Sequence, residues 1–488
     1  MCHLRRCWTI VAITAALGVL TAGCSETTKP TVPAFLLRVS ADSQRGVVRQ
    51  PLPESLVVQV VDSVGRGLPG KAVAWTVTQG GGRLALRTGA DSSGSPSATL
   101  WTTTDDAGRA WVTWTLGTGG PNSVAASAEG LGTVSFSAFA YIVARALSTG
   151  YNFACALTES GDAFCWGLNC YGQLGNGSIS TAISTTPMLV VGGLRFSSIS
   201  AADGFACGLT STGAAHCWGL NQLGQLGIGS TTGPQQCGSY PCSTTPVAVV
   251  GGVTFKSISA GQNNVCGIVA DGNAYCWGEL DGATSRPTPA RVTGGILFSS
   301  LSVGYRRVCG ISTGGAVYCW SPVVLPSSAP VAVSTTEPFA SIATAFAHIC
   351  GIATSSQAYC WGGNSFGQLG IGTTSYADTP TPVAGSLNFT ALSASWYHSC
   401  GTTVGGVAYC WGRDEMGEVG VGSLTPRTVL TPTPASGNVP FVSVSTNVDD
   451  TCGLTASGVA YCWGWNRFGQ VGDGTLTNRP VPTRVTFF

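Results

Sequence analysis

The amino-acid sequence predicts an all-β protein in which a β-sandwich precedes a seven-bladed β-propeller. Glycine is abundant, at 68 of 488 residues, and short apolar stretches alternate with turns, which favours many short strands. A pattern of Cys, nine residues, Cys and Trp occurs seven times in the C-terminal two-thirds of the chain. The spacing of these repeats along the chain is typical of propeller blades. The chain is long enough for two or three folded units, and two suffice.

Charge excludes one class of partner. Only 9% of the residues are charged and the formal net charge is +1. A chain that grips a phosphate backbone needs a concentrated basic field, which this composition does not supply. We therefore expect no nucleic-acid partner.

Residues 1–23 are expected to be a lipoprotein signal peptide. Arg5 and Arg6 precede an uncharged apolar run from Trp8 to Gly23, which is shorter than a membrane-spanning helix. The run ends in LTAGC, which resembles a lipobox, and this resemblance implies that Cys24 is the acylated first residue of the mature protein. The alternative is a simple signal peptide followed by an incidental Cys. We expect an exported protein anchored by lipid alone, at the outer membrane or cell surface.

A polar linker, residues 24–33, leads into the predicted sandwich at residues 34–142. Stretches such as LVVQVVD, AVAWTV and AWVTWTL alternate apolar and polar residues between turns. The segments VVDSVGRGLPG (60–70), GGG (80–82) and TDDAGRAWVTWTLG (104–117) resemble bacterial Ig-like domains of invasin and intimin type, which implies a rigid spacer. Asp105 and Asp106 are better explained as turn residues before Gly108 than as a metal pair.

The repeats at residues 143–488 each predict a disulfide-bonded hairpin. Folding CALTESGDAFC about Ser160 places Cys155 opposite Cys165, with Cα atoms ~4.5–5.5 Å apart, which a disulfide can bridge. An exported chain meets oxidising conditions, and zinc would need four ligands rather than isolated pairs. The predicted pairs are Cys155 with Cys165, Cys207 with Cys217, Cys266 with Cys276, Cys309 with Cys319, Cys350 with Cys360, Cys400 with Cys410, and Cys452 with Cys462.

In every pair, a Trp directly follows the second Cys. Because side chains alternate along a strand, the Trp points to the sheet face opposite the disulfide and can pack against the neighbouring blade. These predicted repeat-core residues are Trp166, Trp218, Trp277, Trp320, Trp361, Trp411 and Trp463.

The segments after the Trp carry a family resemblance. GLNCYGQLGNG (167–177), GLNQLGQLGIG (219–229), GGNSFGQLGIG (362–372), GRDEMGEVGVG (412–422) and GWNRFGQVGDG (464–474) resemble the regulator of chromosome condensation repeat family. The resemblance spans Val143 to Phe488 and implies a seven-bladed propeller. His348 and His398 fall where the family's repeats often carry a His. We expect PTRVTFF at the C-terminal side and ARALSTG at 144–150 to complete one blade together.

No catalytic, cofactor or metal constellation is evident, and we expect no enzyme. Ser312 and Ser365 lie in G-x-S-x-G patterns, but both fall in repeat turns rather than in a strand-to-helix elbow. His216 takes a position held by Phe or Tyr in other repeats and should pack. For His348 and His398, a hydrogen-bonded structural role is preferred over a ligand role.

Three cysteines remain in the repeat region. Cys237 and Cys242 lie in the insertion GPQQCGSYPCSTTP and are expected to form a small loop disulfide. Cys170 is then left as a free thiol. It is either reactive, or paired externally, or a partly buried bystander, and the last is preferred.

These features predict a non-catalytic binding protein of the cell envelope, which presents one propeller face to a protein or glycan ligand. The repeats differ most after each Trp, as in GELDGATSRP and SPVVLPSSAP, and loop variation on one face favours binding there. The alternatives are a secreted enzyme inhibitor or a structural envelope protein. Guanine-nucleotide exchange, as in eukaryotic family members, and glycan-active enzymes rank below these.

Overall fold

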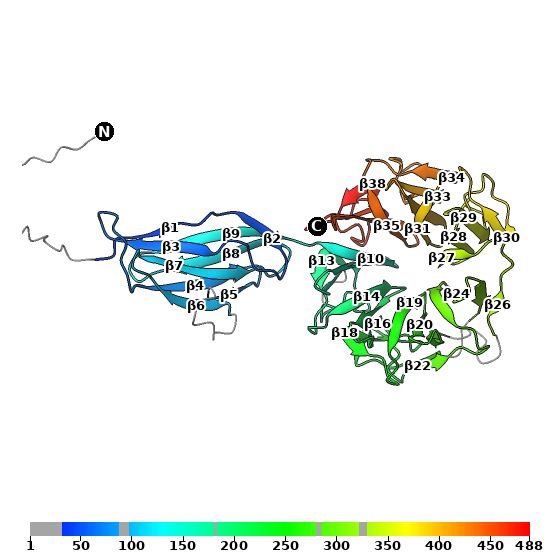
Figure 1. Ribbon diagram of the computed structural model, residues 1–488, viewed down its shortest axis with the longest axis horizontal. Coiled ribbons are helices and arrows are strands. Elements are labelled where there is room, and N and C mark those ends of the chain that lie inside the picture. Colours follow the sequence, from blue (N-terminus) through cyan, green and yellow to red (C-terminus); the bar gives the residue numbers. More distant parts are fainter. Residues whose placement is uncertain (1–31, 87–96, 180–182, 280–284, 322–328) are drawn as a thin grey trace, which may run out of the picture.

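The computed structural model describes residues 32–86, 97–179, 183–279, 285–321 and 329–488. The predicted signal peptide and Cys24 lie outside these ranges. Every regular element in the described ranges is a β-strand, so none of these residues forms a helix that could cross a membrane. The strands form two bodies, an elongated N-terminal domain and a ring of sheets beside it (Figure 1).

Two sheets form the N-terminal domain, and their strands alternate buried and exposed residues, as in β7. Trp75 and Trp114 fill the space between the sheets. One sheet has the order β1 (Phe35–Arg38), β3 (Leu56–Val61), β7 (Arg109–Thr115) and β5 (Arg83–Ala85). The other has the order β2 (Gln44–Val47), β9 (Thr133–Tyr141), β8 (Gly120–Ser127), β4 (Ala72–Gln79) and β6 (Thr99–Thr103).

The repeats form seven antiparallel sheets in the described part of the chain, each made from consecutive strands. Sheet 1 contains β10 (Ala144–Gly150), β11 (Phe153–Thr158), β12 (Ala163–Leu168) and β13 (Ile183–Leu189). Sheet 2 contains β14 (Phe196–Ala201), β15 (Phe205–Thr210), β16 (Ala215–Leu220), β17 (Gln235–Cys237) and β18 (Tyr240–Ala248). Sheet 3 contains β19 (Phe255–Ala260), β20 (Asn264–Val269), β21 (Ala274–Glu279) and β22 (Ser285–Arg291). Sheet 4 contains β23 (Phe298–Val303), β24 (Val308–Ser312), β25 (Val317–Trp320) and β26 (Val331–Ala332). Sheet 5 contains β27 (Phe339–Thr344), β28 (His348–Ala353), β29 (Ala358–Gly362) and β30 (Ala377–Pro382). Sheet 6 contains β31 (Phe389–Ala394), β32 (His398–Thr403), β33 (Ala408–Asp414) and β34 (Arg427–Pro434). Sheet 7 contains β35 (Phe441–Thr446), β36 (Asp450–Thr455), β37 (Ala460–Gly464) and β38 (Arg479–Arg484).

The first strand of each sheet lies innermost and contacts the first strand of the next. These contacts run from β10 through β14, β19, β23, β27 and β31 to β35, and β10 also contacts β35. The sheets therefore surround a common axis (Figure 1). This arrangement of four-stranded sheets is that of a β-propeller.

The cysteine pairs lie in the predicted cross-strand register. Cys155 is the partner of Cys165 between β11 and β12, and the corresponding pairs match in the other six hairpins. All seven pairs form disulfides, with Cα atoms 4.0–4.1 Å apart, slightly below the expected range. The bonded pairs are Cys155 with Cys165, Cys207 with Cys217, Cys266 with Cys276, Cys309 with Cys319, Cys350 with Cys360, Cys400 with Cys410, and Cys452 with Cys462. Cys237 and Cys242 form an eighth bond, at the junction of β17 and β18.

Each space between neighbouring sheets is filled by one disulfide and one Trp. Trp218 of sheet 2 packs in a buried cluster with Cys155 and Cys165 of sheet 1. The same pairing continues around the ring, and Trp166 of sheet 1 shares a cluster with Cys452 and Cys462 of sheet 7. The disulfides therefore belong to the cores between sheets as well as to their own hairpins.

The indole N–H groups of these Trp residues tie neighbouring sheets together. Trp218 Nε1 donates to the Gln173 carbonyl of the preceding sheet at 2.9 Å, and Trp166 Nε1 closes the ring by donating to the Gln470 carbonyl at 2.9 Å. Trp320 follows a sheet whose sequence lacks the GQLG turn, and its Nε1 has no partner among the described residues. The turn after the Trp thus binds the indole of the next sheet for Trp166, Trp218, Trp277, Trp411 and Trp463.

The expectation that the two chain ends share one blade is wrong. β10 pairs with β11 in sheet 1, whereas β38 pairs with β37 in sheet 7. The ends meet through packing instead, because Phe488 contacts the Trp166 ring with centroids 5.9 Å apart.

Phe488 replaces a ring that sheet 1 lacks. The innermost strands of the other six sheets begin with a Phe that contacts the Trp of the same sheet, as Phe196 contacts Trp218. Sheet 1 begins with Ala144 at this position. The Phe requires a Gly beneath it, because a Cβ on Gly208 would lie 2.5 Å from the Phe196 ring. In sheet 1 this position is Ala156, so both exchanges occur together.

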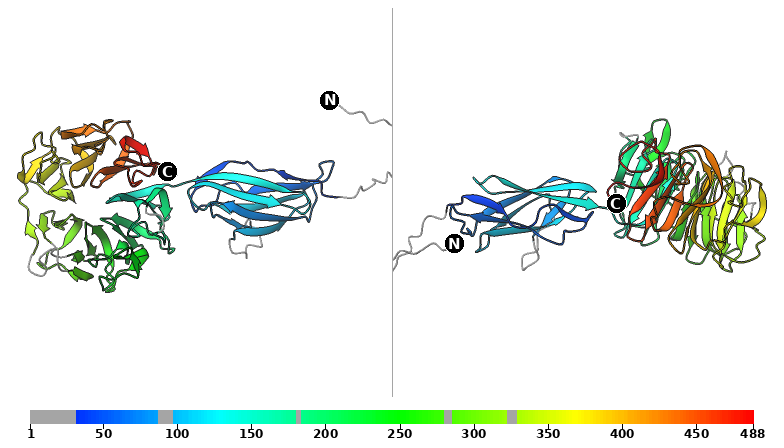
Figure 2. Two further views of the ribbon diagram at one scale, coloured as in Figure 1. Left: turned by 180° about the vertical axis from the view of Figure 1, so that it is seen from behind. Right: turned by 90° about the horizontal axis from the view of Figure 1, so that it is seen from above.

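The N-terminal domain projects sideways from the edge of the ring (Figure 2). The contact between the two domains combines apolar packing with an ion pair. Buried residues of both domains, including Val48, Phe164 and Phe488, share one continuous cluster. Arg49 of the N-terminal domain also pairs with Asp162 of sheet 1 at 3.3 Å.

Candidate functional site

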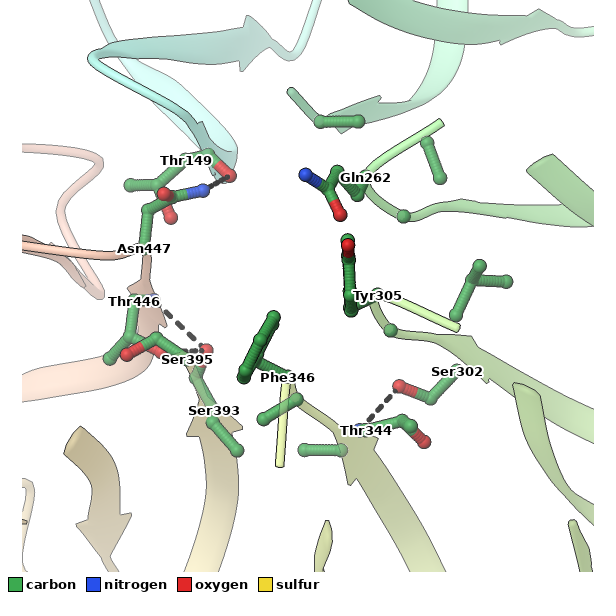
Figure 3. Close-up of a pocket in the computed structure, with 18 of the residues that line it drawn as sticks. Thr149, Gln262, Ser302, Tyr305, Thr344, Phe346, Ser393, Ser395, Thr446 and Asn447 are labelled. Carbon is green, nitrogen blue, oxygen red and sulfur yellow. Dashed lines mark hydrogen bonds between the residues drawn. The ribbon is translucent and has the colours of Figure 1, made fainter. Parts of the chain in front are cut away.

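A cavity of about 300 Å³ lies on the axis of the ring, where the seven innermost strands end. All of its lining residues come from residues 148–448, so the N-terminal domain contributes none. Figure 3 shows side chains of several sheets converging on this opening. The cavity is the candidate binding site.

Serine hydroxyls join the innermost strands around the cavity. Ser148 Oγ accepts the N–H of Ala201 in the next sheet at 2.8 Å, and Ser302 Oγ accepts that of Thr344 at 2.8 Å (Figure 3). Equivalent bonds connect Ser200, Ser259, Ser393 and Ser445 to their following sheets at 2.9–3.1 Å. Ala343 occupies this position in sheet 5. Small hydroxyl side chains thus close the ring while leaving its axis open.

The mouth of the cavity is formed by one residue from each sheet, four positions before the first Cys of the hairpin. Each residue lies in the turn between the innermost strand and the next, so the ring of sheets places all seven around one opening. We call them the mouth residues: Tyr151, Asp203, Gln262, Tyr305, Phe346, Trp396 and Val448.

Three aromatic mouth residues stack on one side of the opening. Phe346 lies between Tyr305 and Trp396, with both centroid distances at 4.6 Å. The guanidinium of Arg306 covers the Tyr305 ring at 5.1 Å. Phe346 is 40% exposed, an unusual position for an apolar ring and typical of a binding surface.

Polar mouth residues lie on the other side. Burial raises the pKa of Asp203, and a hydrogen bond from Gln262 opposes this rise. Asn447 Nδ2 lies 3.5 Å from the Thr149 carbonyl (Figure 3). The mouth therefore combines an aromatic stack with a polar arc formed by Asp203 and Gln262.

The variable segments GELDGATSRP and SPVVLPSSAP lie largely outside the described residues, but two of the recurring post-Trp turns can be placed relative to the mouth. Tyr171, after Trp166, lies against Gly204 in the mouth turn of sheet 2. Phe366, after Trp361, contacts the Tyr397 ring in the mouth turn of sheet 6 with centroids 5.0 Å apart. The post-Trp turns of sheets 1 and 5 therefore lie beside mouth turns of the following sheets.

An Asn and a Gln hold these post-Trp turns in shape. Asn221 Oδ1 accepts the N–H of Leu226 at 3.0 Å, and Gln225 Oε1 accepts that of Leu223 at 2.8 Å. The same contacts occur in sheets 1, 5 and 7. The recurring N-x-x-G-Q element is thus structural.

In sheet 6, carboxylates replace both the Asn and the Gln of this element, and each carboxylate is paired with an arginine. Asp414 is paired with Arg427 at 2.8 Å, and Glu418 with Arg413 at 3.1 Å. Arg413 also pairs with Asp449 of sheet 7. Because Asp and Glu cannot donate as Asn and Gln do, cationic side chains replace the missing donors.

Asp450, at the start of β36, is buried and its Oδ2 has no partner among the described residues. Burial, and next the charge of Glu418, raise its pKa well above the usual value. The folded state therefore binds this proton more tightly than the unfolded chain. Stability falls as pH rises from about 4 through the raised pKa.

We expect Asp450→Asn to stabilise the protein by about 1–3 kcal/mol at pH 8, because it removes an unpaired buried carboxylate. Asn264 occupies the equivalent position in sheet 3. The gain should shrink as pH falls toward 4, as measured by urea unfolding. Asp271→Asn is the control, because backbone N–H donation from Asn273 lowers the pKa of Asp271 and its loss should not stabilise. A less stable Asp450→Asn variant at pH 8 would refute this assignment.

His348 links two sheets and is not placed as a ligand. Its Nε2 lies 2.7 Å from Ser399 Oγ of the next sheet. Ser399 Oγ donates its own proton to the Gln368 carbonyl at 3.0 Å, so His348 Nε2 is the donor. Burial lowers the pKa of His348 to about 3, which keeps the ring neutral.

His398 repeats this arrangement one sheet later. Its Nε2 donates to Thr451 Oγ1 at 2.9 Å, because Thr451 Oγ1 donates to the Glu418 carbonyl. Burial lowers the pKa of His398 to about 3. Both histidines are hydrogen-bonded repeat residues.

The remaining residues that the sequence singled out do not come together in one site. Asp105 Oδ1 accepts the N–H groups of Ala107 and Arg109, as expected for a turn residue. Cys170 is a free and exposed cysteine, which corrects the expectation of partial burial. Ser312 ends β24 and Ser365 lies in a turn. Within the described ranges, no three His, Cys, Asp or Glu side chains gather as a metal site.

The mouth residues were not identified from the sequence. Their one signal is a fixed place, four residues before a Cys, where Tyr, Phe and Trp alternate with Asp, Gln and Val. Variable residues at a fixed place in a repeat are a recognisable binding signature, but only once the turn is known to face the axis.

Comparison with known proteins identifies the repeats. Models of the regulator of chromosome condensation (RCC1) repeat match residues 144–173, 196–225, 255–279, 389–418 and 441–470, and, in a second form, residues 160–209, 355–401 and 457–488. The chain is 29% identical over 136 residues to the ultraviolet-B receptor UVR8 of Arabidopsis thaliana, covering 27% of this chain and 29% of that one. It is 39% identical over 84 residues to the probable E3 ubiquitin-protein ligase HERC4 of Rattus norvegicus, covering 17% and 8%.

These matches span less than a third of either relative. Among solved structures, Prp20p of Saccharomyces cerevisiae, described with its binding properties to Gsp1p and histones, is similar with a TM-score of 0.60 and 21% identity, over 67% of this chain and 87% of Prp20p. That similarity establishes the fold. The chain therefore contains regulator of chromosome condensation (RCC1) repeats, and they lie in a C-terminal region with a β-propeller fold.

Proposed function

We propose that the protein is an exported, lipid-anchored, non-catalytic binding protein of the cell envelope. Its seven sheets act as the blades of a propeller that presents the mouth face to a protein or glycan ligand. The observation that carries this proposal is the aromatic stack of Tyr305, Phe346 and Trp396 at the opening on the axis, in which Phe346 is exposed and its two neighbours are half-buried. Aromatic residues are enriched where proteins bind partners.

Two further observations support the proposal. The N-terminal sandwich, which we take as an Ig-like spacer, packs at the edge of sheet 1 through Arg49 and Val48 and lines no part of the cavity. The mouth face therefore stays free when the chain is held from its N-terminal side. LTAGC supports anchoring through Cys24.

A retention experiment tests the proposal. The chain from Ser25 to Phe488 is immobilised without reductant and exposed to envelope and medium extracts. We expect a bound component that is lost with Trp396→Ala, because a central aromatic anchor dominates binding. Tyr376→Ala, which removes an aromatic ring that is 66% exposed but outside the cavity, should retain it.

Two results would contradict the proposal. Retention that survives Trp396→Ala unchanged would place the binding surface elsewhere. No saturable partner in any extract would favour a structural envelope role.

A further inference from the structure

Two arcs of the mouth differ in chemistry, and Tyr151 and Val448 lie between them. Sheets 4, 5 and 6 contribute the aromatic stack of Tyr305, Phe346 and Trp396. Sheets 2 and 3 contribute Asp203 and Gln262. Figure 3 shows Tyr305 and Phe346 projecting toward the opening, with Gln262 beside them. A ligand that fills the cavity therefore meets an apolar wall on one side and polar groups on the other.

The polar groups have unused hydrogen-bonding capacity. Gln262 hydrogen-bonds Asp203, but Gln262 Oε1 is buried without a partner among the described residues. Thr344 Oγ1 is in the same state. Ser200 and Ser259 accept a backbone N–H, which leaves each hydroxyl proton free to donate. Unsatisfied donors and acceptors around an open cavity are suited to a ligand with several hydroxyl groups.

Volume and charge narrow the class of ligand. At about 300 Å³ the cavity is at the lower end of small-molecule sites, so it admits one small group rather than a folded segment. Asp203 is the one carboxylate among the lining residues, and no Lys or Arg lines the cavity. The guanidinium of Arg306, which follows the mouth residue Tyr305, packs over the Tyr305 ring. A strongly charged ligand would lose its hydration without gaining a counter-ion.

We propose that the mouth binds the terminal sugar of a glycan. The C–H face of the sugar ring packs against the aromatic stack, and its hydroxyl groups meet Gln262, Asp203 and the serine hydroxyls. This inference rests on the proposed binding function and names its ligand class. A pyranose ring has the required combination of one apolar face and a polar edge, without charge.

The test uses an array of immobilised oligosaccharides ending in glucose, galactose, mannose, rhamnose or N-acetylglucosamine. The chain from Ser25 to Phe488 is applied without reductant, and the methyl glycoside of the bound terminal sugar is then titrated by calorimetry. We expect saturable binding of at least one terminal sugar. Phe346→Ala should weaken it about tenfold through the lost ring contact, and Gln262→Ala about fivefold through the lost amide.

Tyr376→Ala, in the same sheet as Phe346, should leave the affinity unchanged. Equal unfolding temperatures of the variants would show that each remains folded. Sugar binding that is insensitive to both mouth substitutions would overturn the inference. So would the absence of sugar binding in a protein that still retains a Trp396-dependent protein partner, and in that case the broader binding function would stand. Loss of both activities would remove the proposed function as well.

Discussion

Reduction of the seven hairpin disulfides is expected to unfold the repeat domain at 37 °C. Each pair stabilises by about 2–4 kcal/mol, and even a partial sum exceeds the 5–15 kcal/mol that typically holds a domain together. Because the sulfurs pack under Trp residues between sheets, as Cys155 and Cys165 pack under Trp218, their loss also loosens the cores that join the sheets. Thermal melting with and without reductant, combined with mass-shift counting of free thiols, measures the effect.

Other parts of the same chain provide controls for the reduction experiment. No cysteine occurs between residues 25 and 154, so a separate transition of the N-terminal domain should shift only through its lost contacts with the repeat domain. Replacing Cys400 and Cys410 together by Ala should destabilise by about 2–4 kcal/mol. Replacing Cys237 and Cys242 by Ser should cost less, because this bond closes a shorter loop between β17 and the start of β18. Unchanged melting of a fully thiol-labelled protein would show that the disulfides are dispensable.

Phe488→Ala is expected to destabilise the protein by about 3–5 kcal/mol, the cost of removing a buried Phe. Phe488 is buried against Trp166 and fills the place that a Phe at the start of the innermost strand fills in the other six sheets. Since Ala144 leaves that place empty, no neighbouring side chain can take over the contact. Urea unfolding followed by tryptophan fluorescence measures the loss.

A designed rescue separates this role from a general effect of truncation. Adding Ala144→Phe and Ala156→Gly to the Phe488→Ala variant restores the arrangement of the other sheets and should recover part of the stability. Phe487→Ala is the matched control, because Phe487 contacts Phe139 of the N-terminal domain instead. It should weaken the joint between domains while sparing sheet 1. Equal stability of Phe488→Ala and the unmodified chain would refute the completion of sheet 1 by Phe488.

Most of the fold could be predicted from the local spacing of residues in the sequence. Nine residues between two cysteines specify a hairpin register, since the partners in an antiparallel ladder are set by the turn alone, and Cys155 and Cys165 accordingly face each other. The Trp that follows must point to the other face of its strand. The all-β class and the RCC1 repeats followed from the same local patterns.

The features that depend on closure of the ring could be found only in the tertiary structure. Tyr305, Phe346 and Trp396 are 41 and 50 residues apart in the chain, and no local pattern states that their turns meet on one axis. The completion of sheet 1 by Phe488 likewise needs the two ends of the repeat region to be adjacent. Register and strand face arise from neighbours in sequence, whereas a cavity, its burial and the raised pKa of Asp203 arise from residues that only the folded ring brings together.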